Sequence, residues 1–311
     1  MAAEGEKELM RRVRVRVPAS TANLGSGFDT LGMALTLYNE VELTDEGDGL
    51  QILVEGEGKS ALEKAGSQNL VVRAAEATLR DLGAHPAGLR VEQFNRIPLR
   101  RGLGSSAAAC LCGIAAGARL AGVELSIDEI LARALPFEGH PDNIAAALMG
   151  GLTVSAIVDG RIVSARIRVP KHLVAIAVIP SLEIATKRAR EALPQQVPFQ
   201  DAVFNLNRLA LLLAGFTMDR LELLAAGSED RLHQPYRARL LPGMEAILEE
   251  GRRGGALATF LSGAGSSVLA LINSYNDEVG RRMGERWHRE FGIENSVRLL
   301  EIDRQGLTYL E

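Results

Sequence analysis

A glycine- and serine-rich stretch is the segment of this chain best suited to bind a ligand. It reads Pro98-Leu-Arg-Arg-Gly-Leu-Gly-Ser-Ser-Ala-Ala108, follows a strand-like run at 89–94, and opens an apolar helix that we expect to reach Ala121. Its two glycines allow a tight turn and a close approach of the backbone to a ligand. The unpaired N–H groups and positive end of a helix favour an anion, most often phosphate. The stretch therefore predicts a phosphate-binding loop.

The side chains of this loop support the prediction. The hydroxyls of Ser105 and Ser106 are placed to cap the helix and to contact a ligand or metal, and Arg100 and Arg101 add positive charge. A tight turn with a capped helix and nothing bound remains the alternative for this stretch taken alone. Two other nucleotide motifs fit less well, because the dinucleotide fingerprint places its glycines directly at a strand end and the Walker loop requires a lysine.

Further polar residues gather in two stretches that read as loops. Asn23 and Asp29 stand six residues apart, at the end of a small-residue segment expected to be a loop over 19–28. The second stretch, Glu138-Gly-His-Pro-Asp-Asn143, joins two helical patterns. Loop Ser, Thr, Asn and Asp side chains usually bond to their own backbone, so residue type alone leaves a structural role open.

The hydrophobic periodicity predicts the elements that must hold these residues. Strict alternation over 11–17 predicts a half-buried strand that ends at Pro18, and Ser126 with Glu129 is typical of a capping box at a helix start. We expect the other strands of the first half at 38–43, 50–54, 89–94, 152–158 and 161–169, the last two joined by an Asp159-Gly160 turn. We expect its other helices at 69–82 and 144–149.

The second half shows the same mixture, after a plausible boundary at Pro170-Lys171-His172. We expect strands at 173–179, 256–261, 267–272, 296–302 and 307–310, and helices at 183–193, within 199–227 and 228–251, and at 277–291. Strands and helices in both halves indicate an α+β fold in two layers.

Composition narrows the class of protein. An apolar content of 47% with 24% charged residues is ordinary for a soluble globular chain, and a net charge of −4 gives no support for a nucleic-acid partner. Cys110 and Cys112 stand two apart on one expected helix and would point to different faces, which excludes a good disulfide, so we expect buried thiols. No apolar run reaches membrane-spanning length, and the charged segment 1–12 is interpreted as a frayed leader. These features favour the cytoplasm.

Four stretches, in order along nearly the whole chain, resemble the GHMP kinases, named for galactokinase, homoserine kinase, mevalonate kinase and phosphomevalonate kinase. The stretch 98–108 resembles their phosphate loop, and Leu-Ser-Gly-Ala-Gly-Ser-Ser-Val at 261–268 resembles their C-terminal glycine motif. The stretches 18–29 and 138–147 are similar to the forms that homoserine kinases carry.

The resemblance implies a GHMP kinase fold of the α+β class. Residues 1–170 would form an ATP-binding domain like domain 2 of ribosomal protein S5, and residues 171–311 a ferredoxin-like C-terminal domain. It also implies ATP and Mg²⁺ as cofactors, and phosphorylation of L-homoserine to O-phospho-L-homoserine in threonine biosynthesis. Members of the family are often dimers, so a homodimer is possible; neither a nucleic acid nor a membrane is expected as a partner.

The resemblance also assigns residues to the donor side of the site. Asn69 would lie by the adenine, and Ser106 and Glu138 would bind the metal. Glu129 is the alternative carboxylate, but it fits a helix cap better. The phosphate-binding residues would be Pro98, Leu99, Arg100, Arg101, Gly102, Leu103, Gly104, Ser105, Ser106, Ala107 and Ala108. The turn at 262–265 would pack against this loop.

The acceptor side is implied in the same way. Asp29 suits an ammonium group and Asn23 a hydroxyl or amino group, while Arg190 and Arg237 suit a carboxylate because a guanidinium binds it through two parallel hydrogen bonds. Asp142 stands where some relatives carry a base, but we expect it to orient the acceptor. The full catalytic set by resemblance is Asn23, Asp29, Glu138, His140, Asp142, Asn143, Thr186, Arg190 and Arg237. His85, His172, His233 and His288 lie in no recognisable motif.

Two other functions remain open. A kinase of the same family acting on mevalonate or shikimate would bind a plain hydroxy acid, whereas the arginine pair with Asp29 suits a zwitterion. A catalytically silent ATP-binding regulator would keep the phosphate loop, but it would have no need of Glu138, Asn23 or the arginine pair.

Overall fold

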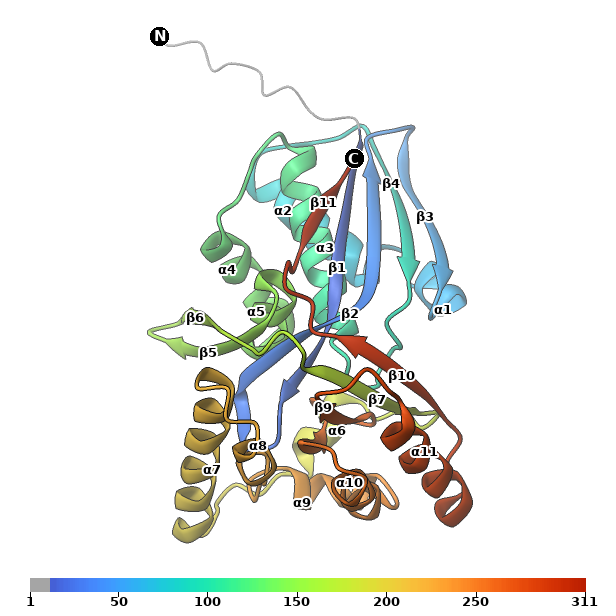
Figure 1. Ribbon diagram of the computed structural model, residues 1–311. Helices are drawn as coiled ribbons and strands as arrows, with labels where there is room; N and C mark the ends of the chain where they lie inside the picture. The colour runs from blue at the N-terminus through green and yellow to red at the C-terminus, as the bar shows by residue number, and fades with distance from the viewer. Residues whose placement is uncertain (1–11) are drawn as a thin grey trace.

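The computed structural model describes residues 12–311, so most of the charged segment interpreted as a leader lies outside the described residues (Figure 1). Two sheets organise the chain. The first has the order β11-β1-β2-β4-β3, with the β5–β6 hairpin joined through β2. The second has the order β10-β7-β9-β8, and all its pairs are antiparallel. When the four strands of this second sheet are numbered 1 to 4 along the chain, their order is 4-1-3-2, as expected for a ferredoxin-like part.

The bounds of the elements follow. The strands are β1 Arg12–Asn23, β2 Gly27–Thr44, β3 Gly49–Gly56, β4 Gly88–Asn95, β5 Leu152–Val158, β6 Arg161–Ile167, β7 Val174–Pro180, β8 Ala258–Leu261, β9 Val268–Ile272, β10 Asn295–Glu301 and β11 Thr308–Leu310. The α-helices are α1 Lys59–Lys64, α2 Leu70–Asp81, α3 Ser105–Leu120, α4 Ile127–Glu138, α5 Pro141–Met149, α6 Thr186–Glu191, α7 Phe199–Thr217, α8 Leu223–Gly227, α9 Gln234–Arg237, α10 Met244–Arg253 and α11 Glu278–Phe291. Short 3₁₀ turns lie at Gly66–Gln68 and Ala238–Leu240.

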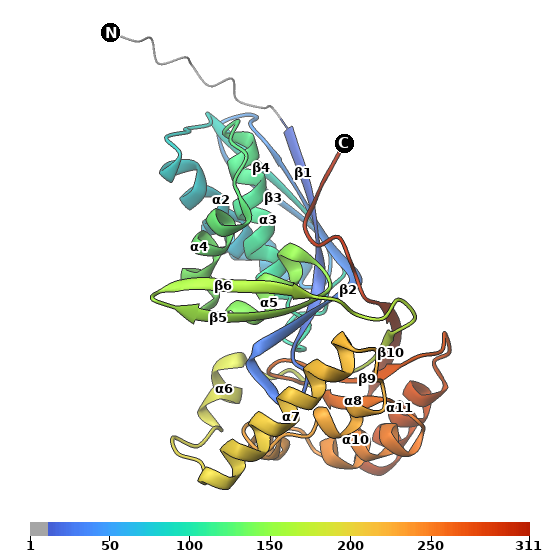
Figure 2. The ribbon, with the colours of Figure 1, turned by 60° about the vertical axis from the view of Figure 1, so that its left-hand side comes forward.

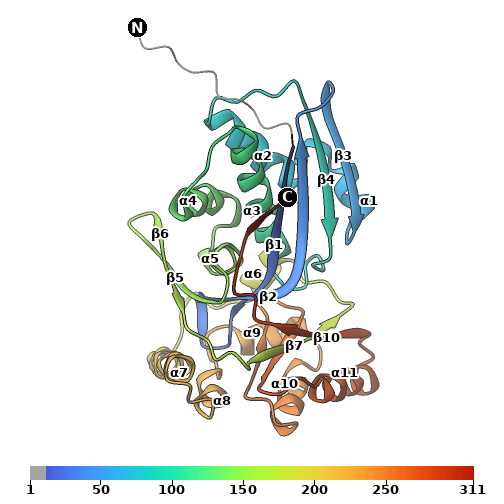
Figure 3. The same ribbon diagram turned by 45° about the horizontal axis from the view of Figure 1, so that its top comes forward.

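The helix that follows the phosphate loop forms the centre of the first part. Helices α2 to α5 cover one face of the first sheet (Figure 3), and α3 is buried on nearly every side. Small residues let α2 approach it closely, since a Cβ on Gly113 would lie 2.4 Å from the Val71 carbonyl oxygen. Cys110 and Cys112 are buried free thiols in this helix, as expected, and burial raises the pKa of both. The phosphate loop is therefore carried on a rigid, fully packed helix.

The first two strands depart from the sequence-based expectation. Pro18 does not end β1, because the pairing with β2 shifts register between Pro18 and Ala19 and then continues to Asn23. Such a bulge accommodates a residue without an N–H group. The loop expected over 19–28 is thus reduced to residues 24–26. Figures 1 and 2 show β1 and β2 running from the first sheet down to the helices of the second part.

A second correction concerns the stretch 138–143, which is not one loop. Glu138 is the last residue of α4, which ends at Gly139 in the left-handed conformation, and α5 begins at Pro141. Glycine after a helix end and proline at the first helical position are the usual signals for these two events. Asp142 and Asn143 therefore lie in the first turn of a helix, which fixes their direction.

The second part packs α10 and α11 against its own sheet. Trp287 of α11 is fully buried, and its indole nitrogen donates to the Pro242 carbonyl oxygen at 2.8 Å. The chain then returns to the first sheet, where β11 pairs with β1 and the C-terminus lies beside it (Figure 1). Within residues 12–311, every helix is too short or too polar to traverse a lipid bilayer.

Candidate active site

One cavity brings together most of the residues assigned from the sequence. They reach it from the β1–β2 turn, the phosphate loop, the ends of α4 and α5, α6, and α9. The predicted residues that line it are Asn23, Asp29, Pro98, Arg100, Arg101, Gly102, Leu103, Gly104, Ser105, Ser106, Ala107, Glu138, His140, Asp142, Asn143, Thr186, Arg190 and Arg237. Ala22, Gly263 and Ala264 complete its lining.

Three assigned residues do not line this cavity. Asn69 caps α2, accepting from the Val71 N–H at 3.0 Å and donating to the Leu62 carbonyl oxygen at 3.2 Å. Leu99 packs beside Gly58, and Ala108 is buried within α3. Asn69 would thus affect binding of the adenine only indirectly, through the helix that it caps.

The start of α3 differs from the expected cap. Gly104, at φ 70°, is the N-cap residue, and neither serine hydroxyl caps the helix. A Cβ at Gly104 would lie 2.1 Å from the Ser20 hydroxyl oxygen, so the loop passes close to β1. The first-turn N–H groups of Ser105, Ser106 and Ala107 therefore have no side-chain cap at the cavity wall. This arrangement suits an anion.

The two arginines of the loop differ in their surroundings. Arg101 donates to the carbonyl oxygens of Pro180 and Ser181 at 2.8 and 2.7 Å and lies 3.3 Å from Glu183. Its guanidinium thus fastens the phosphate loop to the end of β7, which the sequence did not indicate. Arg100 is largely exposed and lies 3.7 Å from Glu183. It is the more available of the two cations.

The glycine turn at 262–265 lies against the phosphate loop, as the sequence suggested. The Ser262 hydroxyl donates to the Gly102 carbonyl oxygen at 2.6 Å, and the Ser267 N–H donates to that of Arg101 at 3.1 Å. A Cβ on Gly102 would lie 2.1 Å from the Ser262 carbonyl oxygen. The two loops are therefore in backbone contact.

This contact predicts a large effect of Gly102→Ala. At φ +74° the new Cβ is strained and also meets backbone that cannot move aside, so we expect a loss of about 3 kcal/mol in the free energy of unfolding and a raised KM for ATP. Urea unfolding and initial rates measure both. Gly160→Ala is the control, because φ is +75° there with no atom within 4 Å of the Cβ. Equal losses in the two variants would contradict the role of the contact.

Hard oxygen donors stand beside the phosphate loop. The exposed Ser106 hydroxyl is hydrogen-bonded to the carboxylate of Glu138, which is half-buried at the end of α4. Burial raises the pKa of Glu138, and the serine bond partly opposes this. Mg²⁺ prefers one or two carboxylates together with phosphate oxygens and water. The donor set at Ser106 and Glu138 fits such a cation.

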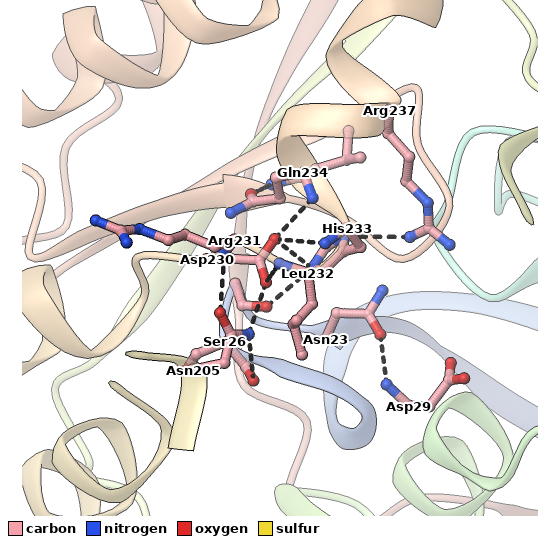
Figure 4. Close-up of polar contacts among 12 residues, drawn as sticks. Asn23, Ser26, Asp29, Asn205, Asp230, Arg231, Leu232, His233, Gln234 and Arg237 are labelled. Atoms are coloured by element: carbon pink, nitrogen blue, oxygen red, sulfur yellow. Dashed lines mark hydrogen bonds and ion pairs between the residues drawn. The ribbon is translucent and has the colours of Figure 1, made fainter. Parts of the chain in front are cut away.

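Asp29 contacts several polar residues of the cavity, and Figure 4 shows its contact with Asn23. Its carboxylate receives two hydrogen bonds from Arg190, at 3.0 and 2.7 Å, and lies 3.8 Å from Nδ1 of His140. Its N–H donates to Asn23 Oδ1 at 3.0 Å, and Asn23 donates to the Gly263 carbonyl oxygen at 2.9 Å. Asn23 and Asp29 both have positive φ, which Asn and Asp tolerate best among non-glycine residues. Asn23 thus holds the turn that presents Asp29.

Two cations flank this carboxylate. Arg190 is part-buried, whereas Arg237 is only 2% exposed and donates from Nη1 to the Gly263 carbonyl oxygen at 2.9 Å. Burial, with a smaller contribution from Arg190, lowers the pKa of Arg237 to about 10, so it remains charged at neutral pH. Burial lowers the pKa of His140, which favours a neutral ring. The carboxylate of Asp29 is therefore paired with the Arg190 guanidinium, and the Arg237 guanidinium is near enough to feel its charge.

Asp142 is a buried acid that forms no ion pair with a residue of the described range 12–311. Burial raises its pKa to about 6, although the Asn143 N–H donates to its Oδ1 at 2.7 Å. Asn143 in turn accepts from the Ser20 hydroxyl at 2.9 Å. Below pH 4 the Asp142 carboxyl group is protonated in both the folded and the unfolded protein. As the pH rises towards 6, only the unfolded protein releases this proton, so the free energy of unfolding falls. Ionised Asp142 therefore costs stability at neutral pH.

This cost predicts that Asp142→Asn stabilises the protein at high pH. Asparagine keeps the oxygen that accepts the Asn143 hydrogen bond but carries no charge. A rise of roughly two units in the pKa of Asp142 corresponds to about 3 kcal/mol. We expect the free energy of unfolding to rise by up to that amount at pH 8 and by little near pH 4, as measured in urea. Asp128→Asn, an exposed acid in the first turn of α4, is the control. An equal gain in the control would refute the assignment.

The same variant tests the chemistry. We expect Asp142→Asn to slow single-turnover phosphoryl transfer without abolishing it, because the role expected for Asp142 is to orient the acceptor. A complete loss of transfer with acceptor binding retained would identify Asp142 as an obligate base instead.

Sequence reasoning missed two residues of the site. His233, set aside as outside any motif, is fully buried and contacts Arg237, and Phe28 packs against both. For His233 the sequence did contain a signal, because this histidine precedes Arg237 by four residues. Residues at that spacing share a helix face.

Comparisons with known proteins agree with this geometry. The model of the GHMP kinases N terminal domain matches residues 69–151, and that of the GHMP kinases C terminal region matches residues 210–289. The chain is 39% identical to the homoserine kinase of Persephonella marina over 297 residues, which is 96% of this chain and 98% of that one. It is 41% identical to the homoserine kinase of Moorella thermoacetica over 292 residues, 94% of this chain and 98% of the other.

Solved structures give the same result. The homoserine kinase of Cytophaga hutchinsonii superposes with a TM-score of 0.83 at 29% identity, covering 97% of this chain and 98% of that one. A mevalonate kinase of L. major has a TM-score of 0.68 at 16% identity, covering 98% and 100%, and shares the fold. The expected GHMP kinase fold is confirmed, and the chain belongs to the homoserine kinase family within the GHMP kinases.

Proposed function

We propose that this enzyme transfers the γ-phosphoryl group of ATP to the side-chain hydroxyl of L-homoserine, giving O-phospho-L-homoserine and ADP in threonine biosynthesis. The observation that carries the proposal is the bidentate pair of Asp29 with Arg190, with Arg237 nearby, in the cavity that the phosphate loop lines. Such a pair offers an acid to an ammonium group and guanidinium groups to a carboxylate. The relatives' names supply the identity of the amino acid.

The donor side follows from the phosphate loop. The N-terminal N–H groups of α3 would bind the triphosphate, with Arg100 adding charge at the rim. Ser106 and Glu138 would hold Mg²⁺, which when bound neutralises negative charge on the phosphates. The packed helix α3 keeps these groups fixed relative to the acceptor side.

Phosphoryl transfer then depends mainly on alignment. The acceptor hydroxyl oxygen forms a bond to the γ-phosphorus as the bond to the β–γ bridging oxygen breaks, ADP leaves, and the hydroxyl proton passes to solvent. Asp142 and Asn143 would orient the hydroxyl, and Thr186 lies in the cavity wall where it could assist. Positioning and charge stabilisation account for most of the rate enhancement in such reactions.

We also propose the division into an ATP-binding part at 1–170 and a C-terminal part at 171–311, with β11 returning to the first sheet. A homodimer in the cytoplasm is proposed for the assembled enzyme. Size-exclusion chromatography with light scattering would show a mass of about twice the 33.4 kDa chain.

A panel of acceptors tests the function. Coupled ADP release, with ³¹P NMR of the product, is expected to show turnover with L-homoserine and little with mevalonate or shikimate. Equal turnover with mevalonate or shikimate would favour another kinase of the family. ADP release that is unaffected by any acceptor, or absent, would favour a silent ATP-binding regulator.

A further inference from the structure

Arg237 is held by a set of contacts that fix its guanidinium group. Its Nε donates to the Ala189 carbonyl oxygen at 3.3 Å, and its Nη1 donates to the Gly263 carbonyl oxygen at 2.9 Å. Nη1 also lies 3.2 Å from Nδ1 of His233, as Figure 4 shows. Hydrogen bonds among the described residues thus engage Nε and Nη1, which leaves Nη2 for a ligand in the cavity.

The contacts of His233 determine where its proton lies. Its Nε2 is 2.8 Å from the Gly25 carbonyl oxygen, which accepts hydrogen bonds only, so Nε2 carries the proton. In a neutral ring Nδ1 is then an acceptor, which is what a guanidinium N–H requires. Burial, together with the charge of Arg237, lowers the pKa of His233 and favours this neutral form, although Asp230 opposes it.

The surroundings hold the ring in this orientation. The carboxylate of Asp230 is buried and accepts from the N–H groups of residues 232, 233 and 234 and from Asn205 (Figure 4). This fixes the backbone of His233. Phe28 stacks on the imidazole, with ring centroids 5.1 Å apart and 21° between planes, and also faces the guanidinium of Arg237 at 5.3 Å. His233 is therefore locked between Asp230 and Phe28, with Nδ1 directed at Arg237.

We propose that His233 is a positioning residue whose neutral Nε2–H form holds Arg237 in the orientation that binds the acceptor carboxylate. The inference rests on the proposed function, because it assumes an acceptor with a carboxylate. A merely structural histidine would support the fold without affecting recognition of that one group. The test must therefore measure discrimination between acceptors as well as overall activity.

Two variants distinguish the contributions of the two ring nitrogens of His233. In His233→Asn the side-chain oxygen lies near the place of Nδ1 and still accepts from Arg237. In His233→Gln the amide reaches the place of Nε2 and leaves Arg237 without its acceptor. The quantity to measure is the ratio of kcat/KM for L-homoserine to that for its carboxamide, which keeps the hydroxyl and the amine. We expect the Gln variant to lower this ratio about tenfold, through KM for homoserine, and the Asn variant to keep it within a few-fold.

Controls distinguish this role from a loss of folding. His172→Gln makes the same change at an exposed histidine and is expected to alter neither the ratio nor the KM for ATP. A fall in kcat/KM of both His233 variants that is equal for the two acceptors would overturn the proposal. So would a Gln variant that keeps the wild-type ratio.

A measurement on the wild-type protein does not depend on either variant folding. The ¹⁵N NMR spectrum of the histidine rings at pH 7.5 is expected to show His233 protonated at Nε2 and unprotonated at Nδ1. A proton on Nδ1, or on both nitrogens, would overturn the inference. This result is independent of the acceptor, so it separates an error about His233 from an error about the reaction. Wild-type enzyme that did not distinguish homoserine from its carboxamide would instead count against the proposed function.

Discussion

Replacing Glu138 by glutamine is expected to lower kcat by about a thousandfold, the scale on which electrostatic contacts to a transition state act. The carboxylate lies at the end of α4 against the hydroxyl of Ser106, at the first turn of the helix that would bind the phosphates. A carboxamide has nearly the same shape but no charge, so it would bind Mg²⁺ poorly. We therefore expect the Mg²⁺ concentration for half-maximal activity to rise as well. Steady-state rates across a Mg²⁺ titration at saturating ATP measure both effects.

Glu129→Gln is the matched control, because Glu129 is a second glutamate of α4 whose carboxylate has a defined hydrogen-bonding role. Its carboxylate accepts from the Ser126 N–H at 2.7 Å at the opposite end of the helix, where it completes the capping box. We expect a small loss of stability and an unchanged Mg²⁺ dependence. A Glu138→Gln enzyme with wild-type kcat and Mg²⁺ dependence would show that the cation is held elsewhere.

The elements with strong local signals could be predicted from the sequence. The helix after the phosphate loop, the capping box at Ser126 and the hairpin through Asp159-Gly160 are present at nearly the expected positions. Periodicity and capping are properties of neighbouring residues, so they need no knowledge of the fold. The path of the chain through Pro18 could not be predicted, because the bulge there depends on the register with β2.

The same distinction applies to the site. Most of the residues assigned by resemblance line one cavity, but the resemblance gave no information on how they are held. The Arg101 guanidinium bonds to the end of β7, and the acceptor for Arg237 is a histidine whose proton position depends on the carbonyl of Gly25. The contacts of Arg101 with Pro180 and of His233 with Gly25 join segments far apart in sequence, and only the folded chain shows them.

Asp29→Asn is expected to lower kcat/KM for L-homoserine by about a hundredfold or more, because the acid that would receive the ammonium group is lost. Asparagine tolerates the positive φ of this position, and the N–H that donates to Asn23 remains. The turn should therefore keep its shape. The variant also removes the bidentate partner of Arg190, which releases the guanidinium to bind a carboxylate.

This reasoning gives a sharper expectation for an acceptor without an amine. 4-Hydroxybutyrate has the carboxylate and hydroxyl of homoserine but no ammonium, so its kcat/KM should change by only a few-fold in Asp29→Asn. Initial rates with both acceptors give the ratio, which we expect to fall about a hundredfold. Asp201→Asn, which breaks a surface pair with Arg231 at 3.1 Å, is the control and should leave the ratio unchanged. An Asp29→Asn enzyme that loses activity equally on both acceptors would show that Asp29 maintains the site without recognising the ammonium group.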